Sequence, residues 1–201
     1  MKKLFFLFVV LSTLVGFTSC GSDDDEIDGS SASSFTVEGI QSDESSADFM
    51  AKTKDGKTLY FKLQSPTTCY IVKSGKYQKT MIGRLEIPSH VSYLGEKLTI
   101  VGIDRSAFYS LEYLSEVIIP STVEFISRYS FQSCNNIESI VLPNILNSLS
   151  SSAFTSCHSL KKVSYKGKTF TSKKELKINL IDSGVEIDGD EPFFSGTALS
   201  D

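Results

Sequence analysis

The sequence predicts an α+β chain that is mostly β, in which a solenoid over residues 81–201 follows a small β cap over residues 35–80. Similar blocks of sequence recur every 23 residues, and such a fixed period is typical of solenoids. Within each block apolar residues alternate, as in strands with one buried face. The 201 residues are 40% hydrophobic and 22% charged, so the chain has enough apolar side chains to build a core.

The first 19 residues have the pattern of a secretory signal peptide. Lys2 and Lys3 precede an apolar run over residues 4–17, which is too short for an ordinary membrane span. Small residues then precede Cys20, and this arrangement resembles a bacterial lipobox, whose cysteine is acylated. Phe17 departs from the leucine that is usual at its position. The resemblance implies lipidation of Cys20, and the alternatives are ordinary cleavage that leaves a thiol or an uncleaved anchor helix.

Residues 20–34 have the composition of a flexible acidic tether that ends in a Gly/Ser segment. Nine acids and no Lys or Arg lie between Cys20 and Met50, whereas the chain from Ala51 onward has 15 acids and 18 bases. The run after the cysteine consists of Ser22, Asp23, Asp24, Asp25 and Glu26. This run resembles the acidic export signal of surface lipoproteins of the Bacteroidetes. That resemblance implies a lipid-anchored outer-membrane protein facing the cell exterior, and a plain linker is the alternative.

The cap is predicted from two strands and a turn. Residues 58–63 and 68–72 are rich in β-branched and aromatic residues, and Asp55-Gly56 is a turn signal before the first of them. An open solenoid end would expose an apolar edge, so a cap is expected there. Residues 85–88 then end the strand of an atypical first repeat, into which a hairpin over residues 91–101 is inserted.

Three blocks of 23 residues align without gaps, beginning at Ile103, Ile126 and Leu149. Their apolar positions form four columns: Phe108, Phe131 and Phe154; Leu114, Ile137 and Leu160; Val117, Ile140 and Val163; and Ile119, Leu142 and Tyr165. The last two columns are two residues apart, which predicts a strand with one buried face. Pro120 and Pro143 then end the strand, because proline cannot donate to a ladder. Stacking of the blocks closes a continuous core.

These columns resemble the BspA-like leucine-rich repeats of bacterial surface proteins. The family pattern is roughly Ile-x-x-x-Ala-Phe-x-x-Cys-x-x-Leu-x-x-Val-x-Ile-Pro, and the resemblance covers Leu85 to about Lys166. Leu111 occupies the cysteine position of the first block, and Lys166 occupies the proline position of the third. The resemblance implies a leucine-rich-repeat fold and, in some relatives, adhesion or binding of matrix proteins.

The chain beyond the third block departs from the repeat. Residues 172–175 have capping-box spacing and predict a short helix that carries Leu176, Leu180 and Ile181. Residues 185–187 predict a further strand. Residues 194–199 look like the start of another repeat, which is either a C-terminal cap or an interrupted array.

No catalytic motif is present in the sequence, so we expect a protein that is not an enzyme and needs no cofactor. The sequence contains no G-x-S-x-G, phosphate loop, H-E-x-x-H or Cys-x-x-Cys. His90 and His158 each stand alone, as surface or capping histidines do. Asp188, Asp190 and Glu191 offer oxygen ligands for calcium, but their spacing fits no known loop, so we predict no metal site.

The cysteines of the folded part leave two alternatives open. Cys134 and Cys157 share one repeat column, and neighbouring coils can bring Cα atoms within the ~4.4–6.8 Å of a disulfide. Free cysteines also pack as small hydrophobic side chains in such columns. Cys69 has no evident partner in the sequence.

The outward residues of the predicted strands form a candidate binding face. They begin with Arg84, and the candidate ligand-binding residues are Glu86, Glu116, Ile118, Ser139, Val141, Lys162 and Ser164. Repeat proteins use such faces to bind partners. The adjacent apolar pair Ile118 and Val141, flanked by charges, is typical of a partner site, although β-branched residues also simply favour strands. We therefore expect adhesion through a protein ligand, host or bacterial.

Other partner classes are less well supported. A net charge of −4 argues against nucleic acid, and membrane contact is expected through the lipid anchor only. The alternative function is a surface glycan-binding accessory lipoprotein. The chain has no Trp, so Tyr109, Tyr113 or Tyr165 would have to stack on a sugar, and we expect Tyr165 to be buried.

Overall fold

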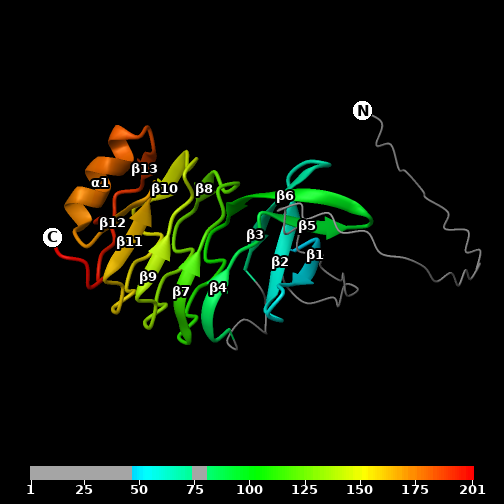
Figure 1. Cartoon of the computed structure of the whole chain (residues 1–201), viewed down its shortest axis with the longest axis horizontal. Helices are drawn as coiled ribbons and strands as arrows, with labels where there is room; N and C mark the ends of the chain where they lie inside the picture. Colours follow the sequence, from blue (N-terminus) through cyan, green and yellow to red (C-terminus); the bar gives the residue numbers. More distant parts are fainter. Residues whose placement is uncertain (1–46, 74–80) are drawn as a thin grey trace, which may run out of the picture. The chain divides into compact units, whose positions relative to one another are not determined.

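The computed structural model describes residues 47–73 and 81–201. The signal peptide, Cys20, the acidic run and the tether lie outside the described residues, as does the predicted cap up to residue 46. Two sheets make up the described part, here called sheet A and sheet B (Figure 1). Sheet A contains β1 (Phe49–Lys52), β2 (Thr58–Leu63), β3 (Thr68–Val72), β5 (His90–Tyr93), β6 (Glu96–Ile103), β8 (Phe125–Ile126), β10 (Ser148–Ser150) and β13 (Glu186–Asp188). Sheet B contains β4 (Gly83–Glu86), β7 (Leu114–Ile118), β9 (Ser139–Val141), β11 (Lys162–Tyr165) and β12 (Lys168–Phe170).

The chain crosses from sheet B to sheet A once per repeat, which confirms the predicted mostly β solenoid. In sheet B, β4, β7, β9 and β11 pair in parallel, and β12 closes the row as an antiparallel strand. In sheet A the successive coils also pair in parallel, and the paired residues are Ile103, Ile126, Leu149 and Ile187. These are the same repeat position in consecutive coils, and the first three are 23 residues apart, so the 23-residue period is the length of one regular coil. Ile187 follows Leu149 after 38 residues, because the last coil also contains β12 and α1.

The aromatic column of the repeat forms the middle of the core. Phe108, Phe131 and Phe154 are fully buried, and their rings stack with centroids 4.8 and 5.0 Å apart. Phe194 continues the column, with its ring 4.9 Å from that of Phe154 in an edge-on arrangement. The predicted additional repeat fragment therefore packs against the end of the stack.

The strands predicted over residues 58–63 and 68–72 and the predicted hairpin are present and join sheet A. Strands β1, β2 and β3 are antiparallel neighbours, and β3 pairs in parallel with β6. Ile71 lies opposite Ile103, and the interval from Ile71 to Leu85 equals that from Ile103 to Val117. A coil in the repeat register thus already begins at β3. The β5–β6 hairpin, which buries Val91 and Leu98, lengthens this coil and conceals the period in the sequence.

The helix α1 (Lys173–Asp182) and strand β13 confirm the elements predicted near the C-terminus. Ser172 caps the helix by accepting a hydrogen bond from the Glu175 N–H. Leu176 and Leu180 are buried, whereas Ile181 is exposed. Among residues 47–73 and 81–201, no helix is both long enough and apolar enough to cross a membrane.

Candidate functional site

The outward side chains of sheet B stand in two columns, and we call this surface the sheet-B face. The first column is Arg84, Glu116, Ser139 and Lys162, and the second is Glu86, Ile118, Val141 and Ser164. Between the two columns, Leu85, Val117, Ile140 and Val163 are fully buried. The structure therefore brings all the candidate ligand-binding residues together on one surface, as period-two alternation predicts.

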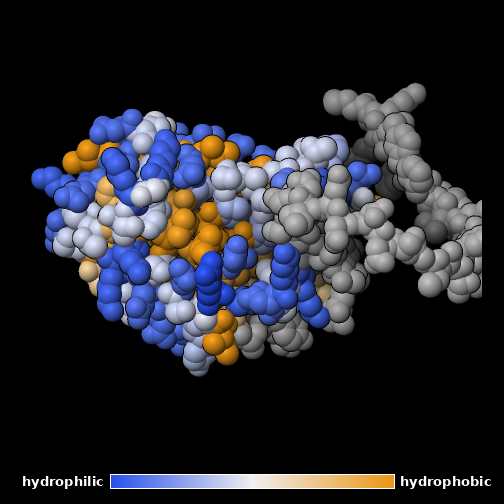
Figure 2. All heavy atoms as spheres, in the orientation of Figure 1, coloured by the Kyte–Doolittle hydropathy of each residue, from blue (hydrophilic) through white to orange (hydrophobic). Residues whose placement is uncertain are grey.

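Ile118 and Val141 form the apolar centre of this face. They are directly paired on β7 and β9, and both are half-buried. Figure 2 shows hydrophobic surface gathered near the ends of β7 and β9, with hydrophilic surface around it. An apolar centre with a polar rim is the composition that protein interfaces favour.

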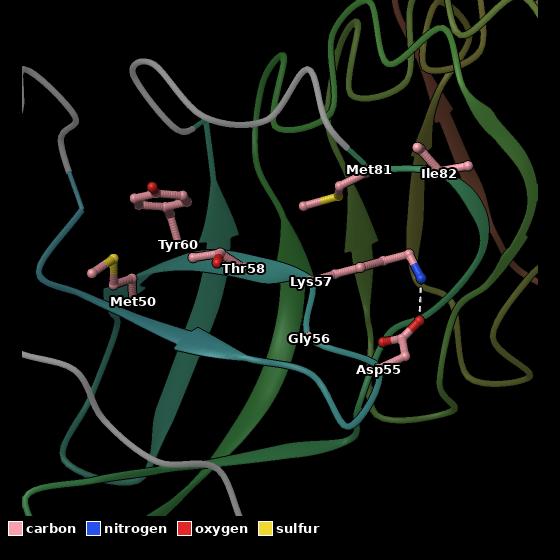
Figure 3. Close-up of a pocket in the computed structure, with 8 residues that line it drawn as sticks. All are labelled: Met50, Asp55, Gly56, Lys57, Thr58, Tyr60, Met81 and Ile82. Atoms are coloured by element: carbon pink, nitrogen blue, oxygen red, sulfur yellow. Dashed lines mark hydrogen bonds and ion pairs between the residues drawn. The ribbon is translucent and has the colours of Figure 1, made fainter.

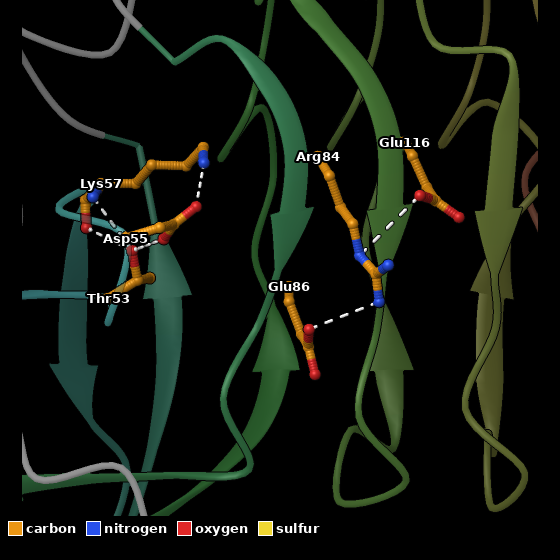
Figure 4. A network of polar contacts seen from close by, with 6 residues as sticks. All are labelled: Thr53, Asp55, Lys57, Arg84, Glu86 and Glu116. Carbon is orange, nitrogen blue, oxygen red and sulfur yellow. Dashed lines mark hydrogen bonds and ion pairs between the residues drawn. The ribbon is translucent and has the colours of Figure 1, made fainter.

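The charged rim at the β4 end is organised by Arg84. Its guanidinium lies 3.5 Å from a Glu86 carboxylate oxygen and 3.8 Å from one of Glu116, as Figure 4 shows. Arg84 and Glu86 are exposed and Glu116 is partly exposed, so the two ion pairs contribute little to stability. Two carboxylates against one guanidinium leave this end of the face acidic.

The opposite end of the face is basic and extends onto β12, which the sequence did not predict as a strand of this face. Lys162 is exposed, and Lys161 beside it lies 3.9 Å from Glu138. On β12, Thr169 pairs with Ser164, and their hydroxyl oxygens are 3.0 Å apart. The dipeptide Lys166-Gly167, which takes positive φ at both residues, is the turn signal that would have revealed this hairpin.

A separate cavity of about 490 Å³ lies beside the cap. Figure 3 shows its lining, which consists of Met50, Asp55, Gly56, Lys57, Thr58, Tyr60, Met81 and Ile82. Burial raises the pKa of the Asp55 carboxyl, but hydrogen bonds from Lys57 and Thr53 more than offset this, so the pKa lies below its usual value. The Asp55–Lys57 ion pair thus stabilises the β1–β2 turn, and none of the predicted site residues lines this cavity.

The three cysteines in the described part are buried thiols rather than disulfide partners. The Sγ atoms of Cys134 and Cys157 each donate a hydrogen bond to a backbone carbonyl of the preceding coil, on Phe108 and Phe131, at 3.0 and 3.1 Å. Burial raises the pKa of the Cys134 thiol to about 12. The sequence left open whether Cys134 and Cys157 form a disulfide or pack as free thiols, and in the structure they are packed free thiols.

The remaining candidate residues are dispersed. His90 lies on β5, where burial and the nearby charge of Lys97 lower its pKa, and its Nδ1 is 2.8 Å from the Ser89 hydroxyl. His158 is exposed in a loop of the third block. Within residues 47–73 and 81–201, no three His, Cys, Asp or Glu side chains are arranged to hold a metal ion, and this includes Asp188, Asp190 and Glu191.

The tyrosines proposed for sugar stacking do not lie together on the sheet-B face. Tyr165 is 1% exposed and belongs to the core, as expected from its column. Tyr109 and Tyr113 are exposed but lie on the turn and loop before β7, outside both columns. The face therefore presents charged, hydroxyl and aliphatic groups to a ligand.

Stacked coils, a buried aromatic column and an outward-facing parallel sheet define the molecule as a solenoid of leucine-rich repeats. The family model for the BspA-type leucine-rich repeat region matches residues 72–179 in six copies. This match covers more than half of the chain, and the chain belongs to that family. Proteins of this repeat class generally bind other proteins and are typically not enzymes.

Solved structures of bacterial leucine-rich-repeat proteins are similar to this chain. A leucine-rich repeat protein from Bacteroides ovatus is 24% identical, with a TM-score of 0.47 over 52% of this chain and 27% of the other. A leucine-rich cell surface protein from Faecalibacterium prausnitzii is 22% identical, with a TM-score of 0.46 over 53% and 30%. The chain thus spans less than a third of the length of either protein. Among curated proteins, none matches this chain.

Proposed function

We propose that this chain is a lipid-anchored protein of the cell surface that mediates adhesion by binding a protein ligand on the sheet-B face. The observation that carries the proposal is the in-register pair Ile118 and Val141, which places an apolar centre between an acidic rim and a basic rim. A partner that covers this centre gains burial of aliphatic surface, and the two rims fix its orientation.

The chemistry of the face favours a polypeptide as this partner. Beneath the centre of the face, β7, β9 and β11 are each paired on both sides, so a ligand there must be recognised by side chains. Those side chains supply carboxylates, hydroxyls, aliphatic groups and a lysine, which match the mixed chemistry of a protein surface. A sugar platform needs an exposed aromatic ring, and neither column contains one.

Changing Ile118→Asp together with Val141→Asp is expected to lower the affinity for the ligand by about a hundredfold, because two carboxylates would be buried in the interface without partners. Binding is measured by surface plasmon resonance against immobilised matrix and mucosal proteins. The matched control is Leu94→Asp together with Ile145→Asp, which alters two exposed apolar residues away from the face.

The control should bind as the parent does, and all three proteins should unfold at similar temperatures. Saturable binding that both double variants retain equally would refute the sheet-B face as the site. A ligand found only on a glycan array would instead favour the accessory glycan-binding role.

The proposed location rests on the N-terminal sequence. Residues 1–19 have the signal-peptide pattern, Cys20 follows small residues, and the acidic run begins two residues later. An acylated Cys20 would hold the protein at the membrane, since more than one acyl chain gives stable anchoring. The acidic run would then act as the outward address.

The change Cys20→Ser is expected to release the protein into the soluble fraction or leave it unprocessed. Changing Asp23, Asp24, Asp25 and Glu26 to Ala should keep the protein in the membrane fraction but protect it from protease added to intact cells. Fractionation with immunoblotting measures both effects. A cleaved Cys20→Ser protein that stays with membranes would exclude lipid anchoring. Continued protease sensitivity of the alanine variant would reduce the acidic run to a tether.

A further inference from the structure

A groove of about 470 Å³ lies at the C-terminal end of the solenoid, between α1 and the loop over residues 192–196. Its lining consists of Lys173, Lys174, Lys177, Pro192, Phe193, Ser195, Gly196 and Asp201. Three lysines therefore face one aromatic ring and one carboxylate. The groove shares no residue with the sheet-B face.

The lysines occupy positions that the dipole of their own helix disfavours. Lys173 and Lys174 lie in the first turn of α1, where the helix dipole favours anions, and Glu175 is the only acid of that turn. Lys177 follows one turn later on the same side and lies 5.9 Å from the centroid of the Phe193 ring. Within the described part of the chain, neither Lys174 nor Lys177 forms an ion pair with a carboxylate. This excess of positive charge is directed at the groove.

Ser200 pairs with the segment just before α1 and places Asp201 at one end of the groove, where Asp201 is one of the lining residues. Ser200 forms a parallel bridge with Ser172, donates its N–H to the Thr171 carbonyl at 2.9 Å and accepts the Lys173 N–H at 2.8 Å. The carboxylate of Asp201 then lies 2.6 Å from the Lys173 ammonium. The Asp201 side chain is 99% exposed, so this carboxylate can be displaced without opening the core. One lysine of the groove thus already binds a carboxylate, that of Asp201.

We infer that this groove is a second binding site, which takes an acidic extended segment of a partner polypeptide, with its carboxylates on Lys174 and Lys177 and an apolar side chain against Phe193. The charges are complementary, since three lysines against Asp201 leave the groove with an excess of positive charge. The Thr171 carbonyl and the Lys173 N–H are already paired with Ser200, so the segment is recognised through its side chains.

Phe193 supplies the apolar part of the site. Its ring stacks on that of the fully buried Phe194, with centroids 4.2 Å apart, so it is held in place by the core. The exposed side of the ring faces the groove beside Pro192. An aromatic or aliphatic side chain of the segment would cover it, which distinguishes this site from a plain lysine surface.

The test uses the full chain without its signal peptide and a fluorescein-labelled peptide of alternating aspartate and phenylalanine, measured by fluorescence anisotropy. The charge probe is the same peptide with asparagine in place of aspartate. The groove variant is Lys174→Gln together with Lys177→Gln. The matched control is Lys161→Gln together with Lys168→Gln, which removes two lysines outside the groove.

Saturable binding of the aspartate peptide is expected, weakening about five- to tenfold in the groove variant and unchanged in the control, because each exposed ion pair contributes only a modest amount. Asp201→Asn should strengthen binding by freeing Lys173. Binding should also weaken in 1 M salt, where charges are screened beyond about 3 Å. The Ile118→Asp and Val141→Asp changes should leave this binding intact, which separates the site from the sheet-B face.

Equal affinity for the asparagine peptide, or an equal loss in the control variant, would overturn the inference. Tight binding of polygalacturonate with none of the peptide would replace it with a site for acidic sugars. Phe193→Leu keeps an apolar side chain at the ring position and serves as a second variant. It should bind the peptide more weakly than the parent does, because leucine covers less apolar surface than the phenylalanine ring. If it binds as the parent does while Lys174→Gln with Lys177→Gln weakens binding as expected, the proposed contact with the ring is wrong.

Discussion

The change Phe131→Ala is expected to lower the free energy of unfolding by about 3–5 kcal/mol, which is the range for removing a buried phenylalanine ring. Phe131 is fully buried, and its ring stacks on Phe108 at 4.8 Å and on Phe154 at 5.0 Å. Its loss therefore leaves a cavity that is bounded by both neighbouring rings. Because coils contact only their neighbours, the coils on either side lose stability together.

Urea unfolding followed by circular dichroism measures this change. Tyr109→Ala is the matched control, because Tyr109 is an aromatic residue of the neighbouring coil that is 43% exposed. The control should cost less than about 1 kcal/mol, as exposed positions usually do. A loss for Phe131→Ala that is no larger than that of the control would show that the aromatic column does not hold the coils together.

The change Gly102→Ala is expected to cost about 1–3 kcal/mol through overpacking, although the backbone of Gly102 does not require glycine. A Cβ atom at this position would lie 1.9 Å from Cζ of Phe125, so the ring would have to move. The two residues are direct partners on β6 and β8, and the Phe125 ring also lies 6.1 Å from that of Tyr70. Phe125 thus covers the backbone of its glycine partner.

A double-mutant cycle tests this contact. In the Phe125→Ser background, Gly102→Ala should cost much less, because the space above residue 102 is then open. Thermal unfolding of the four proteins gives the coupling. If the losses of unfolding free energy for the two changes are simply additive, a Cβ atom at residue 102 does not clash with the Phe125 ring.

Repetition made much of the fold predictable from the sequence. The phenylalanine column and the two face columns recur at a fixed period, so their burial or exposure follows from stacking alone. The outward pair Ile118 and Val141 was predictable for the same reason. The elements that interrupt the period were harder. The coil that begins at Ile71 contains an inserted hairpin, so its relation to Ile103 appears only when β3 and β6 pair.

Contacts between residues at unlike repeat positions could not be predicted. The approach of Phe125 to Gly102 depends on sheet register, and no spacing in the sequence encodes it. The lysine groove depends on α1 and residues 199–201 meeting at the end of the solenoid, where the repeat pattern has ceased. The sequence shows only a short run of lysines there.

Site-specific photocrosslinking on intact cells tests the central claim most directly. A benzoylphenylalanine is placed at Ser139 or Ser164 on the sheet-B face and, as a control, at Glu112 or Glu124, which are exposed on the coil that begins at Ile103, outside both columns. The binding account predicts discrete protein adducts from Ser139 and Ser164 that disappear in the Ile118→Asp and Val141→Asp background, and none from the controls. Adducts from Glu112 and Glu124 alone, or from all four positions equally, would contradict it.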